Sequence, residues 1–104
     1  MIPNEQEQFR KIQQKHQARR ILEILINDAF HGRTNDGILG DILHLFAVGG
    51  SPQQIRSAID RLEQMGLVRT QKHDECTVVE ITGQGERVAS GLESCEGVAR
   101  FVRD

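Results

Sequence analysis

The segment GGSPQQIRSAIDRLEQMGLV, residues 49–68, carries the clearest local structural signals in the chain. Ser51 is a strong helix N-cap, and the proline that follows it suits the first helical position. Gln54 stands three residues after Ser51, where a capping box requires it. Gly66 occupies the position of a left-handed C-terminal cap. These signals predict a helix over residues 51–65.

The two faces of this helix differ in character. At 100° per residue, one side is apolar and is expected to face the core: Ile55, Ala58, Ile59 and Leu62. The opposite side is polar, and two arginines flank it: Gln53, Ser57, Asp60 and Gln64, with Arg56 and Arg61. The polar side is the candidate functional face.

Two helices are predicted before this segment. The first spans residues 3 to about 30, with Asn4 as its cap and apolar residues at spacings of three and four from Ala18 onward. The second runs over roughly residues 35–47 and is capped by Thr34 or Asn35. The polar stretch HGRTND between them is typical of a loop.

Residues 1–17 are far more polar than the rest of the first helix, since their only apolar side chains after Pro3 are Phe9 and Ile12. Three interpretations are open for this helical extension: a solvated helix, a frayed arm or a dimer contact. The basic segment Arg10–Arg20 is a third candidate for DNA contact, beside the polar helix face and the hairpin described next, with a partner surface or a solvated helix as the alternatives. A solvated face is the commoner role for such a charged segment.

The chain after residue 66 predicts one β-hairpin and a short helix. The segments LVRTQK and CTVVEIT are rich in β-branched residues and give strands over residues 67–72 and 76–82. Since a lone hairpin is not stable, it must pack on the helices. Thr82 is expected to cap a helix over residues 83–92, with Val88, Ala89 and Leu92 facing the core. In the tail, residues 94–104, we expect partial docking through Val98, Phe101 and Val102.

Length and composition set broad limits. The chain has 104 residues, enough for one small domain, and a formal net charge of −2. No apolar run approaches the length of a membrane span, the N-terminus is not a signal peptide, and two cysteines do not form a disulfide framework. We therefore expect a reduced, cytoplasmic protein without membrane contact.

The charge is unevenly distributed, because residues 1–20 carry Arg10, Lys11, Lys15, Arg19 and Arg20 against only Glu5 and Glu7. That segment is positive and the remainder is acidic. The net charge argues weakly against a generic nucleic-acid binder, so any attraction to DNA has to come from local patches.

The predicted element order is helix, helix, helix, hairpin, helix. This order indicates a mainly α (α+β) fold, a winged helix-turn-helix over residues 18–93, with a three-helix core, one β-hairpin wing and a short C-terminal helix. SPQQIRSAIDRLEQMGLVRTQ and VVEITGQGERVASG together resemble the C-terminal half of winged helix-turn-helix regulators of the ArsR/MarR type. From about Ile21 to Gly91, the segments ILGDIL, GLVRT and TGQGERVASG are similar to small ArsR-like proteins of Mu-like phages.

The resemblance implies a sequence-specific transcriptional regulator, bacterial or phage-derived, that binds double-stranded DNA. It also implies a homodimer formed through the terminal helices. The N-terminal part of the third helix would enter the major groove, where Gln can pair with adenine and Arg with guanine or phosphate. The predicted DNA-binding residues lie on that helix and on the wing: Ser51, Gln53, Gln54, Arg56, Ser57, Asp60, Arg61, Gln64, Arg69, Lys72 and His73.

Two acidic features favour a different class of function. Asp60 lies in the middle of the candidate face, although it can pair with Arg56 or accept from cytosine N4. The wing tip carries Asp74 and Glu75, which weaken phosphate binding. The alternative is a winged-helix adaptor that binds a protein partner, for example in phage assembly or packaging, without binding DNA. An adaptor of this kind would expose an apolar patch of more than a few hundred Å².

The sequence offers little for catalysis or metal binding. It has no Gly-rich phosphate loop, no HExxH motif and no nucleophile motif. The second helix lacks the paired cysteines typical of ArsR metal sensors, and Cys76 and Cys95 form no CxxC pattern. We expect no enzyme activity, no metal and no cofactor.

Overall fold

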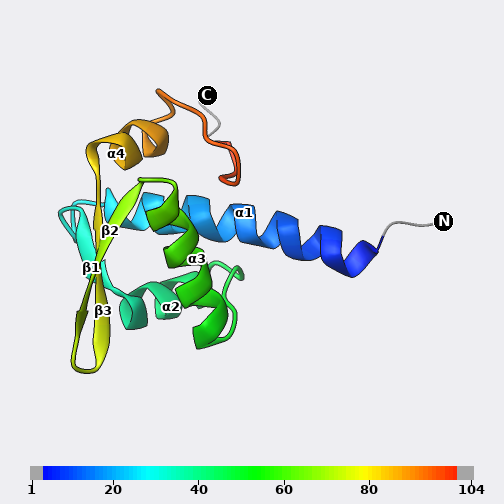
Figure 1. Cartoon of the computed structure of the whole chain (residues 1–104), viewed down its shortest axis with the longest axis horizontal. Coiled ribbons are helices and arrows are strands. Elements are labelled where there is room, and N and C mark those ends of the chain that lie inside the picture. Colours follow the sequence, from blue (N-terminus) through cyan, green and yellow to red (C-terminus); the bar gives the residue numbers. More distant parts are fainter. Residues whose placement is uncertain (1–3, 101–104) are drawn as a thin grey trace.

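In the computed structural model, which describes residues 4–100, a small antiparallel sheet lies at one side of the body and the helices pack against it (Figure 1). The elements in chain order are α1 Glu5–Leu25, β1 Arg33–Asn35, α2 Asp36–Leu45, α3 Pro52–Gln64, β2 Val68–His73, β3 Cys76–Ile81 and α4 Gly83–Ala89. The described residues therefore form an α+β domain with four helices and a three-stranded sheet of order β1-β3-β2. The first half of α1 projects from the body as an arm (Figure 1).

α1 begins as the sequence predicts and ends earlier. The Asn4 side chain accepts a hydrogen bond from the Glu7 backbone N–H at 3.3 Å, so the predicted cap is confirmed. The predicted helix end near Phe30 is wrong, because α1 stops at Leu25. Asn27 causes the stop: its side-chain oxygen accepts from the Ala29 N–H at 2.9 Å, a local turn that competes with helical hydrogen bonding.

The stretch HGRTND, predicted as a loop, contains a strand. β1 pairs with β3 in antiparallel register, with Thr34 opposite Val79, and the Thr34 side chain is buried. The prediction of a lone hairpin is therefore wrong, since β1 adds a third strand. Asn35, rather than Thr34, caps α2 by accepting from the Ile38 N–H at 2.9 Å.

α3 matches its prediction closely. The Ser51 hydroxyl accepts from the Gln54 N–H at 3.1 Å, and the Gln54 side chain accepts from the Ser51 N–H at 2.9 Å. Both halves of the capping box are thus confirmed. Gly66 has φ of 78°, the left-handed conformation predicted for the C-terminal cap.

The hairpin lies where the sequence places it. β2 and β3 pair in antiparallel register from Val68 opposite Ile81 to His73 opposite Cys76. Alternation along β2 turns the side chains of Val68 and Thr70 toward the helices. One face of the sheet therefore closes the core.

α4 is shorter than predicted. Thr82 caps it by accepting from the Gly85 N–H at 3.0 Å, as expected, but the helix ends at Ala89. Val88 and Ala89 are buried, whereas Leu92, predicted to face the core, is 67% exposed. Leu92 lies beyond the helix end and so loses the helical spacing that would have turned it inward.

The tail after α4 returns to α1. Val98 is buried, the Ala99 N–H donates to the Lys15 carbonyl at 3.0 Å, and Arg19 donates to the Arg100 carbonyl at 2.7 Å. The expected contributions of Phe101 and Val102 lie outside the described residues.

One hydrophobic core joins all these elements. Its largest fully buried side chains are Ile21, Leu22, Leu25, Leu39, Leu43, Ile59, Leu62, Leu67, Val68, Val79 and Val88. Because aromatic residues are scarce, aliphatic side chains fill this volume. The apolar stripes of α1 and α3 and the inner face of the sheet meet here, which fixes α3 relative to the hairpin.

Gly85 marks the tightest backbone approach in this core. A Cβ at position 85 would overlap the carbonyl oxygen of Leu67, whereas one at Gly83, in the same helical turn, would meet only ordinary contacts. We predict that Gly85→Ala lowers the unfolding free energy by about 1–3 kcal/mol, as overpacking does. Gly83→Ala is the control, and it should leave the unfolding free energy unchanged or raise it slightly. Urea denaturation measures both, and equal stabilities would contradict the close approach.

Candidate functional site

The outward face of α3 is the largest set of predicted site residues that the structure brings together. Ile55, Ala58, Ile59 and Leu62 are buried beneath it. Five predicted residues are exposed on the other side: Gln53, Arg56, Ser57, Asp60 and Gln64. The helix thus presents a polar row to solvent, with donor, acceptor and charged groups on adjacent turns.

Two predicted contact residues are already used within the chain. Ser51 and Gln54 exchange the hydrogen bonds of the capping box, which occupy the Ser51 hydroxyl and the Gln54 side-chain oxygen. The Gln54 side-chain nitrogen takes no part in the box. These side chains therefore hold the start of α3, which leaves recognition chiefly to the residues that follow.

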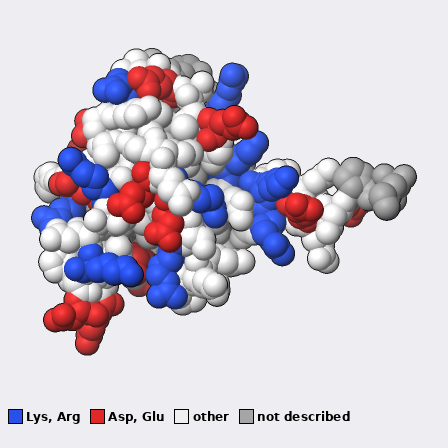
Figure 2. All heavy atoms as spheres, in the orientation of Figure 1, with Lys and Arg blue, Asp and Glu red and all other residues white. Residues whose placement is uncertain are grey.

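Charge on this face is mixed. Within the part of the chain described, no ion pair joins Arg56 to Asp60, so the expected neutralisation of Asp60 is not seen. Figure 2 shows basic and acidic side chains interspersed over α3 and the hairpin, with a separate basic group where α1 leaves the body. The face is not a continuous positive surface.

The hairpin is tied to α3 by one carboxylate. Glu63 accepts from the Thr70 N–H at 3.0 Å and from the Thr70 hydroxyl at 2.8 Å. The Thr70 N–H points away from β3, so Glu63 also closes the open edge of β2. Lys72 lies two residues further along, on the same side of the strand as Thr70.

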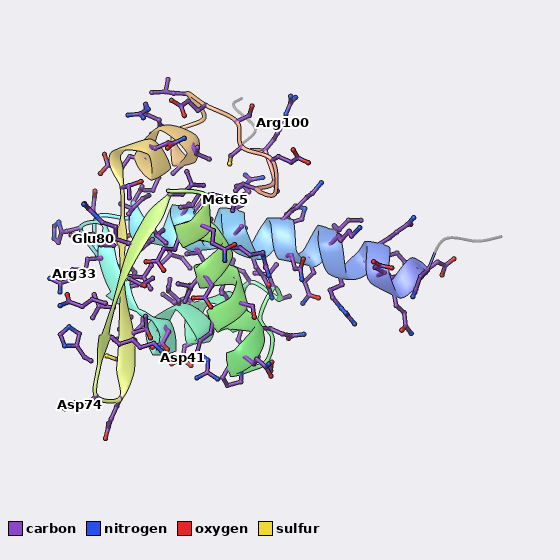
Figure 3. The ribbon with its side chains drawn as sticks, viewed as in Figure 1. Arg33, Asp41, Met65, Asp74, Glu80 and Arg100 are labelled. Atoms are coloured by element: carbon purple, nitrogen blue, oxygen red, sulfur yellow. The ribbon has the colours of Figure 1, made fainter. Side chains whose placement is uncertain are left out.

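Arg69 lies on the other side of the sheet. It pairs with Glu80 at 3.8 Å and lines a shallow groove with Arg33 and Gln71. Figure 3 shows Arg33 and Glu80 at the edge of the molecule away from α3. By alternation His73 shares the Arg69 side of β2. Lys72 therefore lies on the side of β2 that faces the helices, and Arg69 and His73 lie on the opposite side.

Sequence reasoning missed the contribution of the α1 glutamines. Gln17 is 3% exposed and donates to the Val48 carbonyl at 3.0 Å, and Gln13 donates to the Gly49 carbonyl at 3.1 Å. These bonds fix the turn between α2 and α3. The i, i+4 spacing of Gln13 and Gln17 was the available signal, but glutamines on a polar helix do not reveal which ones are buried.

Arg61 occupies a place different from the other charged residues of α3. It is partly buried and lines a polar groove between α3 and the α1 arm, with Arg10, Gln14 and Ser57. This groove was not predicted. It makes the flank of α3 that faces α1 part of the candidate site.

A second surface is apolar. Leu45 is 83% exposed and Phe46 is 49% exposed at the end of α2, and Arg20 of α1 lies over the Phe46 ring at 4.2 Å. With Phe30 and Ile42 they line a hollow between α1 and α2. We call these four side chains, Phe30, Ile42, Leu45 and Phe46, the apolar patch.

Comparisons with known proteins give no relative: no protein-family model, curated protein or solved structure matches the chain. Among residues 4–100, no helix has both the length and the apolar character of a membrane span. In the same range, no group of three or more His, Cys, Asp or Glu side chains is placed to hold a metal ion. Both cysteines are free thiols.

The link between Glu63 and Thr70 can be tested directly. We predict that Glu63→Ala lowers stability by about 1 kcal/mol and speeds hydrogen exchange at the Thr70 amide, because two hydrogen bonds to a carboxylate are lost. Gln64→Ala, one residue along the same exposed helix, is the matched control, since Glu and Gln have similar helix propensity. Equal exchange rates at Thr70 in the two variants would show that Glu63 does not hold the strand.

Proposed function

We propose that the chain is a winged helix-turn-helix protein that binds double-stranded DNA as a transcriptional regulator. In this assignment α2 and α3 form the helix-turn-helix, α3 is the recognition helix and the β2–β3 hairpin is the wing. One observation carries the proposal: α3 is capped at both ends and packed on its apolar side, and its polar row is exposed beside the hairpin. Rigid presentation of a polar helix is what major-groove recognition requires.

The residue types on α3 suit base recognition. Near the N-terminus of the helix, Gln53 can pair with adenine, and Arg56 with guanine or phosphate. Ser57 can serve either base edge, and Asp60 can accept from cytosine N4. Lys72 on the wing would contact the backbone. Because the face has mixed charge, non-specific attraction is weak and base contacts must supply most of the discrimination.

A pair of opposite charge changes on the same face tests this proposal. We predict that Arg56→Gln weakens binding to a mixed-sequence duplex and that Asp60→Asn strengthens it, each by roughly fivefold, since one charge near a phosphate is worth about 1 kcal/mol. Asp28→Asn makes the same net-charge change at the turn after α1 and is the control. Fluorescence anisotropy at low and moderate salt measures all four proteins.

Two results would contradict DNA binding through α3. The first is that Asp60→Asn and Asp28→Asn change the DNA affinity equally, because the change would then come from the net charge of the protein alone. The second is that the wild type shows no binding at low salt even at protein concentrations above ~10⁻⁴ M. That concentration is the weak end of the non-specific dissociation constants of DNA-binding domains.

The apolar patch favours a second candidate function, a winged-helix adaptor that docks an amphipathic helix of a protein partner. Leu45 and Phe46 lie at the end of α2, beside α1. Exposing these apolar side chains to water is unfavourable in free energy unless another chain covers them. A second copy of this chain is the other occupant that the patch would accept, in a dimer that differs from the expected one through the terminal helices. Both occupants would bury the patch and leave α3 free.

Leu45→Lys tests the patch, with Leu92→Lys as the matched control because Leu92 is also exposed but lies outside it. The adaptor function predicts that the wild type and Leu92→Lys retain a common protein in affinity capture and that Leu45→Lys loses it. Sedimentation of the purified chain separates a second copy from a different protein. Equal capture of that protein by all three baits would show that the apolar patch does not dock it.

A further inference from the structure

The groove between the α1 arm and α3 differs in charge from the rest of the candidate site. It has a volume of about 250 Å³ and is lined by Arg10 and Arg61, several glutamines and Ser57. No acidic side chain lines it. It borders Gln53 and Ser57, so it opens beside the outward face of α3. α3 packs against α1 next to the point where the arm leaves the body (Figure 1).

Arg61 is the unusual member of this groove. Its Nη2 atom is buried and has no hydrogen-bond partner among the described residues. Buried side-chain donors in folded proteins nearly always have a partner, so each exception calls for an explanation. No carboxylate lines the groove, and the Gln54 oxygen is used in the capping box, so neither pairs with Arg61.

The groove selects for a particular kind of ligand. A guanidinium binds phosphate in a bidentate geometry through its N–H donors, and Arg10, the second arginine of the lining, adds charge. The lining is polar, with no aromatic side chain on which a base could stack. The site therefore suits a phosphate group without a nucleobase beside it.

We propose that Arg61 and Arg10 form a phosphate site, and that its ligand is a phosphodiester of the DNA strand that borders the α3 contact. This proposal rests on the DNA-binding function proposed above. A helix in the major groove has a phosphate backbone on each flank, and α3 carries Arg56 on one flank and Arg61 on the other. The α1 arm then contributes a backbone contact through Arg10, one of the basic residues that the sequence offered as a third candidate for DNA contact.

The salt dependence of DNA binding tests the site. A variant that loses one phosphate contact reduces the slope of log K against log[salt] by about 0.9. Arg61→Gln and Arg10→Gln should each show this reduction and weaken binding to all duplex sequences alike. Lys11→Gln removes the same charge from the neighbouring arm position outside the groove and should keep the slope. Arg10 is exposed, so its variant stays informative if Arg61→Gln fails to fold.

A titration with inorganic phosphate separates this proposal from the DNA-binding function. The probe is the Nε–Hε NMR signal of Arg61 in the full chain. A shift with both duplex DNA and inorganic phosphate, weakened by Arg10→Gln, supports the site and its DNA source. A shift with inorganic phosphate alone supports the phosphate chemistry and overturns its DNA source and the DNA-binding function.

Two other outcomes would overturn the site. One is wild-type DNA binding with a slope that neither Arg61→Gln nor Arg10→Gln changes, which leaves the DNA-binding function intact. The other is an Arg61 signal that moves with neither ligand.

Discussion

The junction at the end of α3 is the constraint on which the rest of the domain depends. The Thr82 hydroxyl donates to the Gly66 carbonyl at 2.7 Å and accepts from the Gly85 N–H, while the Thr82 N–H donates to the Leu67 carbonyl at 3.0 Å. Four elements therefore meet at one threonine: the end of α3, the start of β2, the end of β3 and the start of α4. Because Gly85 lies against the Leu67 backbone, the junction has no room to shift.

This junction makes α3 and the hairpin a single rigid unit. Glu63 adds a second link along the helix, and the buried α3 stripe adds a third against α1. Side chains on rigid elements are held in fixed relative positions, which is the condition for reading a surface as regular as a DNA groove. In the proposed DNA complex, the mixed charge of the α3 face would shift the binding energy from general attraction to particular contacts.

The two halves of α1 have different roles. Its C-terminal half fills the core with Ile21, Leu22 and Leu25, and the turn before them, at Gln13 and Gln17, holds the loop that precedes α3. Its first turns project from the body, and basic side chains gather where the helix leaves the body (Figure 2). Because the arm is anchored through the loop before α3, it keeps a defined position beside α3. Arg10 and Arg61, which are far apart in the sequence, therefore line one groove.

The sequence by itself determined the local structure, in particular the caps of α1, α3 and α4, the glycine at the end of α3 and the two strands of the hairpin. Those features depend on hydrogen bonds and φ preferences within a few residues. It also identified most of the α3 face. Only the tertiary structure decided the pairing of β1 with β3, the separation of Arg69 from Lys72 and the burial of Gln17 and part of Arg61. These depend on which distant segment lies alongside each residue, and helical or strand periodicity carries no information about that neighbour.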